Sequence, residues 1–259
     1  MARTIYVNEV ELNVVDIGAG SPALVFLHYW GGSSRTWVPV MEHLASTNRC
    51  VGIDFRGWGR SSKETGDYSL RTLASDVMGV VEQLALKEFF ILGHSMGGKV
   101  AQIVAARKPS GLRGLILFGP APPAPMNVPE DQRKGYVGLY DTREGAEMVI
   151  RNLTPHSLPD RFREQIIEDS MSGSPGAKRA WPLQGMIADI REEAAKIDVP
   201  VHIIAGGDDS VEPEASLRAA FGQCVRDVDF VVLPGVGHMA PLEAPSKLAD
   251  AIRSAQKSC

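Results

Sequence analysis

Short apolar runs recur along the chain, separated by longer segments whose apolar residues follow helical spacing. The runs lie at 23–27, 50–53, 89–92 and 112–118, with helical patterns at 36–45, at 70–84 and directly after residue 95. Strands that are apolar at every position are typical of a parallel sheet covered on both faces. Upstream, 4–7 and 10–17 alternate in polarity around Asn8-Glu9, which predicts an antiparallel hairpin at the sheet edge. The pattern predicts the α/β class, with a doubly wound, mostly parallel sheet and right-handed crossovers.

The alternation of strands and helices stops at Gly119-Pro120 and resumes near residue 199. Between these points the pattern predicts only helices, at 129–139, 141–153, 159–171 and 178–195. Asp141 and Glu144 have the spacing of a capping box. Strands at 199–205 and 228–233 and helices at 214–221 and 242–256 follow. We expect one core made of residues 1–119 and 191–259, with residues 120–190 (the cap segment) inserted as a helical cap over the strand ends, where such sheets bind ligands.

Composition and charge argue against several classes of function. The 259 residues carry a net charge of -4 without a basic cluster, so neither nucleic acid nor an anionic membrane is an expected partner. No apolar stretch is long enough to cross a bilayer, and residues 1–7 lack the apolar core of a signal peptide, which favours a cytoplasmic protein. Cys50, Cys224 and Cys259 are odd in number and widely spaced, and the histidines lack metal-ligand spacing, so we expect neither disulfides nor a metal site.

The third of the four apolar runs ends in a serine enclosed by small residues, Gly93-His94-Ser95-Met96-Gly97-Gly98. A serine on a sharp strand-to-helix turn projects its hydroxyl away from the backbone, and only glycine leaves room for the chain that crosses beside it. The N–H of Met96 then lies at a helix N-terminus, where unpaired donors and the helix dipole favour an anion. The motif predicts a nucleophile at Ser95 and one oxyanion donor at Met96.

A serine nucleophile needs a base and a carboxylate, and two loops after later strands supply them. Val236-Gly237-His238 follows the last predicted strand, and histidine suits both the removal and the return of a proton. His94, beside the serine, is expected to point elsewhere. Gly206-Gly207-Asp208-Asp209 follows the preceding strand, and only one of its two aspartates can face the histidine. From the residues alone, Asp208 and Asp209 both remain candidates.

Several separated motifs, in this order, resemble the α/β-hydrolase superfamily, and the resemblance covers essentially the whole chain. They are Leu27-His28 with Gly31-Gly32, Asp54-x-Arg56-Gly57-x-Gly59-x-Ser61, the Ser95 elbow, Gly206-x-x-Asp209 with Pro213, and Gly237-His238-x-x-Pro241-Leu242-Glu243. The resemblance implies the α/β-hydrolase fold with the triad order Ser95, Asp209, His238. It favours Asp209 as the acid. Arg56 is expected to organise its loop as a hydrogen-bond donor and not to act in catalysis.

The resemblance also implies a second oxyanion donor, the backbone N–H of Trp30. The chain departs from the family pattern at Tyr29, where glycine is usual and which would tolerate a positive φ badly. Aromatic residues around these loops and in the cap segment are candidates for the substrate pocket: Tyr29, Trp58, Tyr136, Tyr140 and Trp181.

The expected function is that of a cofactor-free serine hydrolase acting on a small, mainly apolar carboxylic ester or lactone. Esterases, enol-lactone hydrolases and cofactor-free haloperoxidases or perhydrolases are the groups that the elbow resembles most. Two alternatives stay open: haloperoxidase or perhydrolase activity at the same residues, and a ligand-binding protein that keeps the fold without catalysis. The sequence does not indicate an oligomeric state.

Overall fold

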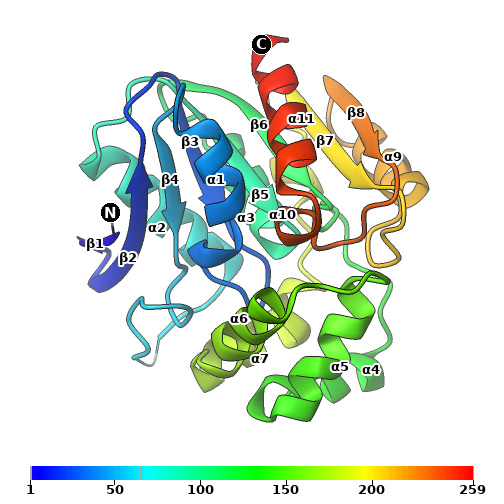
Figure 1. Cartoon of the computed structure of the whole chain (residues 1–259). Coiled ribbons are helices and arrows are strands. Elements are labelled where there is room, and N and C mark those ends of the chain that lie inside the picture. Colours follow the sequence, from blue (N-terminus) through cyan, green and yellow to red (C-terminus); the bar gives the residue numbers. More distant parts are fainter. Residues whose placement is uncertain (1, 65, 259) are drawn as a thin grey trace.

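A computed structural model describes residues 2–64 and 66–258, and its centre is a sheet of eight strands in the order β1-β2-β4-β3-β5-β6-β7-β8 (Figure 1). The strands are β1 (Ala2–Val7), β2 (Val10–Ile17), β3 (Ala23–Leu27), β4 (Cys50–Ile53), β5 (Phe89–His94), β6 (Leu112–Phe118), β7 (Val201–Gly206) and β8 (Val228–Leu233). In this order, every neighbouring pair from β4 through β3 to β8 is parallel. The pairs β1–β2 and β2–β4 are antiparallel. The predicted sheet is confirmed, strand for strand.

The turn between β1 and β2 uses the two residues that the sequence placed there. Asn8 has φ 47° and Glu9 has φ 65°. Positive φ at both central residues is the signature of the hairpin turns whose twist matches that of the flanking strands. The first hairpin is therefore set by its own two-residue turn.

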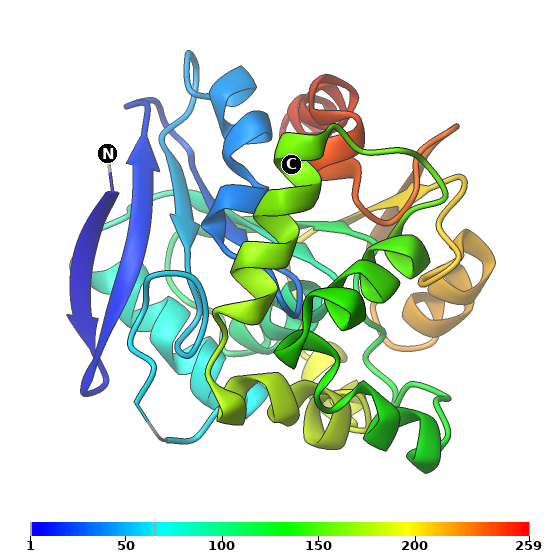
Figure 2. The same ribbon diagram turned by 60° about the horizontal axis from the view of Figure 1, so that its bottom comes forward.

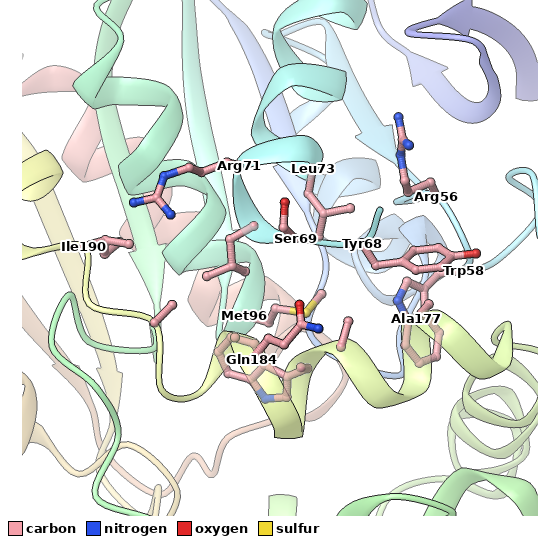
Figure 3. Close-up of a pocket in the computed structure, with 15 residues that line it drawn as sticks. Arg56, Trp58, Tyr68, Ser69, Arg71, Leu73, Met96, Ala177, Gln184 and Ile190 are labelled. Carbon is pink, nitrogen blue, oxygen red and sulfur yellow. The ribbon is translucent and has the colours of Figure 1, made fainter. Parts of the chain in front are cut away.

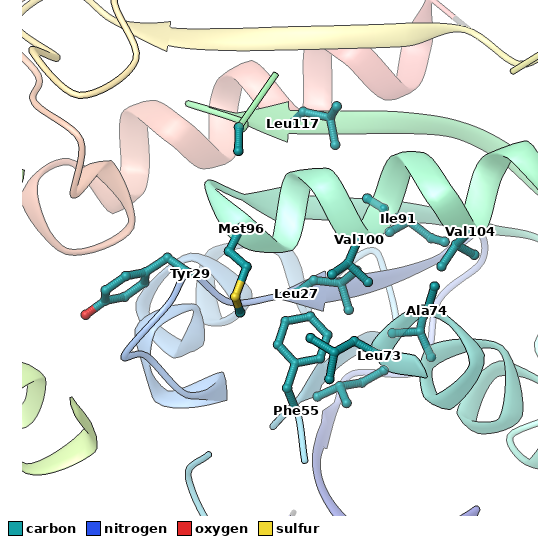
Figure 4. Packing of buried hydrophobic residues seen from close by; sticks show 14 of the residues in the cluster. Leu27, Tyr29, Phe55, Leu73, Ala74, Ile91, Met96, Val100, Val104 and Leu117 are labelled. Atoms are coloured by element: carbon teal, nitrogen blue, oxygen red, sulfur yellow. The ribbon is translucent and has the colours of Figure 1, made fainter. Parts of the chain in front are cut away.

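Helices cover both faces of the sheet, and each face has its own apolar core. Helices α2 (Leu70–Gln83) and α3 (Met96–Ala106) cover one face, and α1 (Val38–Leu44) and α11 (Pro245–Lys257) pack together on the other (Figure 1). Ile91 of β5 packs toward α2 and α3 (Figure 4), whereas Leu92 belongs to the core of the opposite face. A strand alternates its side chains between faces, and each fully buried leucine or isoleucine contributes about 1.5–3 kcal/mol, so runs without polar residues are needed here.

The chain between β6 and β7 contains only helical elements: α4 (Glu130–Tyr136), η2 (Leu139–Asp141), α5 (Arg143–Leu153), α6 (Asp160–Met171), α7 (Pro175–Ala180), the π-helical turn η3 (Trp181–Gly185) and α8 (Arg191–Ala194). In Figure 1 helices α4 to α7 lie below the sheet, on the side toward which its parallel strands point, and Figure 2 brings them in front of that edge. The exact limits of the cap segment stay a prediction.

Two details of the cap segment differ from prediction. The helix predicted at 178–195 is broken into α7, η3 and α8, because Pro182 cannot donate its share of the helical hydrogen bonds. The capping box is also wrong: Thr142 caps α5 by accepting a hydrogen bond from the Gly145 N–H at 3.1 Å. Asp141 instead pairs with the ammonium of Lys178 at 2.9 Å.

The predicted closing helix at 242–256 is two helices. The short α10 (Ala240–Glu243) ends at Ala244, whose φ of -145° and ψ of 55° leave the helical region, and α11 begins at Pro245. A proline disfavours helical geometry in the residue before it, which is why the break falls there. The helix predicted at 36–45 likewise starts later, at Val38, after a 3-10 turn at Ser34–Thr36 (η1). Helix α9 (Glu214–Gly222) agrees with its predicted range.

Candidate active site

Ser95 lies on the turn between β5 and α3 with φ 52° and ψ -117°, a conformation that costs energy for any residue with a Cβ. The neighbouring glycines are needed for this turn. A Cβ on Gly93 would lie 2.6 Å from the carbonyl oxygen of Gly97, and a Cβ on Gly97 would lie 2.5 Å from the carbonyl oxygen of Leu27. The Ser95 backbone is held to the next strand, since its N–H donates to the Phe118 carbonyl at 3.3 Å.

His238 and Asp209 form a buried pair although 29 positions separate them in the sequence. The imidazole Nδ1 lies 2.7 Å from the Asp209 Oδ2, and a carboxylate at that position makes Nδ1–H the donor. The other Asp209 oxygen accepts hydrogen bonds from the N–H groups of Val211 and Glu212, at 2.8 and 2.9 Å. Burial alone would raise the pKa of Asp209, but the charge and hydrogen bond of His238, together with these amides, hold that pKa below its ordinary value. The carboxylate therefore stays ionised beside the imidazole.

Of the two adjacent aspartates, Asp209 faces His238 and Asp208 does not. The Asp208 carboxylate lies 3.1 Å from the Nε2 of His156 and is 45% exposed, whereas the Asp209 side chain is fully buried. Gly206 makes this arrangement possible, because a Cβ there would lie 2.5 Å from the Val236 carbonyl oxygen and 3.2 Å from the Asp209 Cβ.

The Nε2 of His238 is buried and has no hydrogen-bond partner among the described residues. It does not bond to the Ser95 hydroxyl, although both side chains line one pocket. His238 therefore lines the pocket with one nitrogen held by Asp209 and the other without a partner among the described residues, and no hydrogen bond joins it to Ser95 in this structure.

His94 does not point away from the site, contrary to the sequence expectation. Its ring centre lies 4.8 Å from that of His238 and 5.1 Å from that of Tyr29. Burial, with the nearby His238, lowers the pKa of His94 well below its ordinary value, so the ring is neutral. The period of the strand could have predicted this contact, because His94 has the same parity as Phe90 and Leu92, which face the core on the α1 and α11 side.

Gly119 is a second residue at the site that sequence reasoning missed. It follows β6 directly, between the strands that carry Ser95 and Asp209, and has φ +44°. A Cβ at this position would lie 3.0 Å from both the Asp209 Oδ2 and the His238 Nδ1. Only a residue without a side chain leaves the pair undisturbed.

The N–H groups of Trp30 and Met96 are the two predicted oxyanion donors. Neither makes a backbone hydrogen bond among those found in residues 2–64 and 66–258. A Cβ on Gly97 would also lie 2.6 Å from the His28 carbonyl, so the loop after β3 and the start of α3 are in close contact. Tyr29 has no positive φ, and the left-handed conformation of this loop falls on Gly31 at φ +90°. Tyr29 therefore does not need the positive φ that it would tolerate badly, because Gly31 adopts the left-handed conformation in this loop.

Side chains hold both ends of this loop. The Trp30 indole N–H donates to the Lys178 carbonyl at 3.0 Å. The backbone carbonyl of Trp30 accepts a hydrogen bond from the Tyr140 hydroxyl at 3.1 Å. The buried His28 accepts the Phe55 N–H on Nε2 at 3.0 Å, and burial lowers the pKa of His28 to about 4. The loop is therefore supported from the cap segment on one side and from the loop after β4 on the other.

Arg56 organises the loop after β4. Its guanidinium makes two hydrogen bonds to the buried Asp76 of α2, at 2.6 and 2.7 Å. Its charge is thus matched within the core, and Arg56 does not line the pocket that contains Ser95.

Two further ionisable side chains are buried near Asp209. Burial and the charge of Asp209 raise the pKa of Glu212 well above its ordinary value, and Lys99 of α3 opposes this shift. Burial in turn lowers the pKa of Lys99 to about 8, and its ammonium donates to the Ala124 carbonyl at 3.1 Å. No sequence motif drew attention to either residue.

A cavity of about 130 Å³ contains Ser95 and His238. Of the predicted pocket residues, Tyr29, Tyr136, Tyr140 and Trp181 line it. Trp58 does not: its indole packs edge-on against Tyr140 and lines a neighbouring cavity, so its role in substrate binding stays a prediction. The remaining walls are mainly apolar, with Trp30, Met126, Leu139, Val149, Asn152, Leu153, Met186 and Val211.

The described residues hold no cluster of three or more histidine, cysteine or acidic side chains suited to a metal ion. Cys50 and Cys224 are free thiols, and Cys259 lies outside the described residues. Across the same part of the chain, every helix is too short or too polar to span a bilayer.

Comparisons with known proteins agree with this architecture. The family model described as "alpha/beta hydrolase fold" matches residues 22–144. The AB hydrolase superfamily protein YisY of Bacillus subtilis is 28% identical, with 92% of each chain covered. A non-heme haloperoxidase of Rhodococcus erythropolis is 27% identical, with 93% of this chain and 94% of the relative covered.

Solved structures show the same fold over almost the whole chain. An esterase from Exiguobacterium antarcticum has a TM-score of 0.91 at 24% identity and covers 99% of this chain and 100% of its own. The enol-lactonase from Burkholderia xenovorans has a TM-score of 0.83 at 22% identity, with 98% and 100% covered.

Proposed function

The chain belongs to the α/β-hydrolase superfamily, and from this we propose that it is a serine hydrolase that cleaves a small, mainly apolar carboxylic ester or lactone. The observation that carries the proposal is the buried His238–Asp209 pair: His238 lines the same cavity as Ser95, and its Nε2 has no hydrogen-bond partner among the described residues. A neutral imidazole held in one tautomer by a carboxylate is what a serine hydroxyl requires to become a nucleophile.

In the first half of the reaction, the Ser95 oxygen attacks the substrate carbonyl and its proton passes to the Nε2 of His238. The N–H groups of Trp30 and Met96 stabilise the oxyanion, and each such donor contributes about 3 kcal/mol in the transition state. Asp209 fixes the Nδ1–H tautomer and stabilises the imidazolium. The imidazolium then protonates the leaving alkoxide, which leaves an acyl-enzyme on Ser95.

In the second half, water enters against the acyl group and the same histidine accepts its proton. The resulting hydroxide attacks the ester carbonyl of the acyl-enzyme, and His238 returns the proton to the Ser95 oxygen as the carboxylic acid departs. No net proton is stored on the protein, so one base serves both halves.

The size and lining of the cavity support a small apolar substrate. A cavity of about 150 Å³ in a protein core holds a benzene molecule, and the cavity at Ser95 has a volume of about 130 Å³ with mainly apolar walls. Related structures carry the names esterase and enol-lactonase, which supports ester and lactone substrates as the first compounds to test.

Labelling with an organophosphate followed by intact-mass measurement tests the proposal. We expect one adduct on the wild-type protein, none on Ser95→Ala, and loss of p-nitrophenyl ester turnover in that variant. Ser110→Ala changes an exposed serine away from the site and is the matched control. Turnover by Ser95→Ala at the wild-type rate would overturn the proposal, and absence of both adduct and turnover in the wild type would favour a binding protein that keeps the fold.

Perhydrolysis is a second candidate, because several relatives carry the name haloperoxidase or chloroperoxidase. Hydrogen peroxide in place of water would attack the same acyl-enzyme and release a peracid. Formation of peracid from acetate and peroxide, lost in Ser95→Ala, would establish this activity beside ester hydrolysis.

A further inference from the structure

A second cavity of about 200 Å³ lies beside the one that contains Ser95. Figure 3 shows it between Ser69 and Leu73, at the N-terminus of α2, and Ala177 and Gln184 of the cap segment, with Met96 between the two sets. Met96 follows the proposed nucleophile directly in the sequence, so this cavity lies close to the proposed reaction site.

Trp181 is the one described residue that lines both cavities. Trp181 is 4% exposed, so its indole lies in the interior, where it forms part of the wall of each cavity. Residues next to each other in the chain divide between the cavities: Ser95 and Met186 line the first, Met96 and Gly185 the second. The two spaces are therefore neighbours that share the Trp181 side chain as a wall.

The backbone around Trp181 is built to seat this indole. The π-helical turn of η3 closes with a hydrogen bond from the Met186 N–H to the Trp181 carbonyl at 2.9 Å. A Cβ on Gly185 would lie 2.3 Å from the indole Cε3, so only glycine fits beneath the ring. Single π-helical turns within helices are frequent at functional sites, and here the turn orients the Trp181 indole between the two cavities.

The second cavity does not call for a charged ligand. The Arg56 guanidinium is paired with Asp76, and the Arg71 guanidinium is paired with Glu193. With both cations matched, the other walls are mainly apolar, among them Leu70, Leu73, Ala180, Ala188 and Ile190. A hydrocarbon chain is the ligand that such a space suits.

We infer that Trp181 is the residue that sets the length of the substrate chain. The indole ends the pocket at Ser95 and confines it to about 130 Å³, and its removal joins this pocket to the second cavity of about 200 Å³. The inference rests on the proposed ester hydrolysis and deepens it: the natural substrate carries a short group on the side of its ester bond that faces Trp181.

The test compares Trp181→Ala with the wild type on two ester series. One series lengthens the acyl chain of p-nitrophenyl esters from acetate to octanoate, and the other lengthens the alcohol of alkyl acetates. We expect the ratio of kcat/KM for the longest chain to that for the shortest to rise at least about tenfold in one series, since one methylene already changes specificity by about 10- to 200-fold in a fitted pocket. The responding series identifies which side of the ester faces Trp181.

Two variants make the result specific. Trp181→Ala with Ala188→Phe places a ring in the second cavity and should return the preference to short chains. Leu183→Ala alters an exposed residue of the same turn that lines neither cavity, and it should keep the wild-type profile. Should Trp181→Ala fail to fold by its thermal transition, Trp181→Leu, which keeps an apolar side chain at the position, replaces it.

An unchanged chain-length profile in folded, active Trp181→Ala would overturn the inference while ester hydrolysis stands. A profile that shifts equally with and without Ala188→Phe would also overturn it, because the second cavity would then not be the space used. Absence of ester turnover in the wild type would instead overturn the proposed function.

Discussion

Gly119→Ala is the sharpest small perturbation of the proposed site. The new methyl group would lie 3.0 Å from the Asp209 Oδ2, 3.0 Å from the His238 Nδ1 and 3.1 Å from the His238 Cε1. All three distances are shorter than ordinary carbon contacts of about 3.5–4.0 Å, so the pair must move by about half an ångström. A misplacement of about 1 Å costs about 100-fold in rate, so we expect kcat to fall by about 10- to 100-fold.

The same change strains the backbone, because Gly119 has φ +44°. An alanine in a left-handed conformation costs about 1–2 kcal/mol. Calorimetry should therefore show a thermal midpoint lower by about 2–8 °C, a loss that leaves the protein folded under assay conditions.

Gly235→Ala separates the two effects. Gly235 has φ +69° and no atom within 4 Å of the position of a Cβ, so alanine there meets strain without contact. We expect a similar loss of stability and a kcat near the wild-type value. Equal kcat values for Gly119→Ala and the wild type, measured on p-nitrophenyl acetate, would refute the reasoning, as would equal losses of kcat in the two alanine variants.

Three further changes follow from the same contacts. Asp209→Asn should lower kcat by about 10⁴-fold, as expected when the imidazole loses its tautomer partner, and Asp208→Asn should stay near wild type; the reverse order in an ester assay would exchange their roles. Lys99 has a pKa of about 8 when folded and 10.5 as a free side chain. The unfolded chain therefore binds more protons between these values, and stability rises with pH there. Between pH 8 and pH 10 this rise in the free energy of unfolding is about 2 kcal/mol. Lys99→Met should lack it in urea unfolding at the two pH values, and parallel pH profiles of the variant and the wild type would contradict this. Asp76→Ala leaves the buried Arg56 charge without its partner and should lower the free energy of unfolding, measured in urea, by about 3–5 kcal/mol. A change near zero would refute this.

The strands were predictable because their burial on both faces leaves a continuous apolar run in the sequence. Val25, Phe26 and Leu27 must all be apolar, since alternate side chains enter opposite cores. Helix ends were less predictable. Thr142 and Asp141 are both good capping residues, and the choice between them depends on Lys178, which lies far along the chain.

The motifs of the site could be recognised in the sequence because each depends on a tight turn formed by neighbouring residues. A serine at a strained corner and a histidine in a glycine loop leave marks within a few residues. Gly119 and the contacts of Trp58 leave no such mark, because each is defined by what lies across the sheet or beneath the cap segment. The position of Trp58 in the second cavity depends on how α7 packs, which no short pattern encodes.

The order of the strands also has a consequence for biosynthesis. The corner at Ser95 follows β5 in the middle of the sheet, whereas His238 follows β8 at its far edge and is the last of the three residues to be synthesised. A nascent chain can thus form the serine corner while it still has no base to ionise the hydroxyl. Ester cleavage would begin only when β8 pairs with β7, so that the onset of activity during translation reports the closing of the sheet.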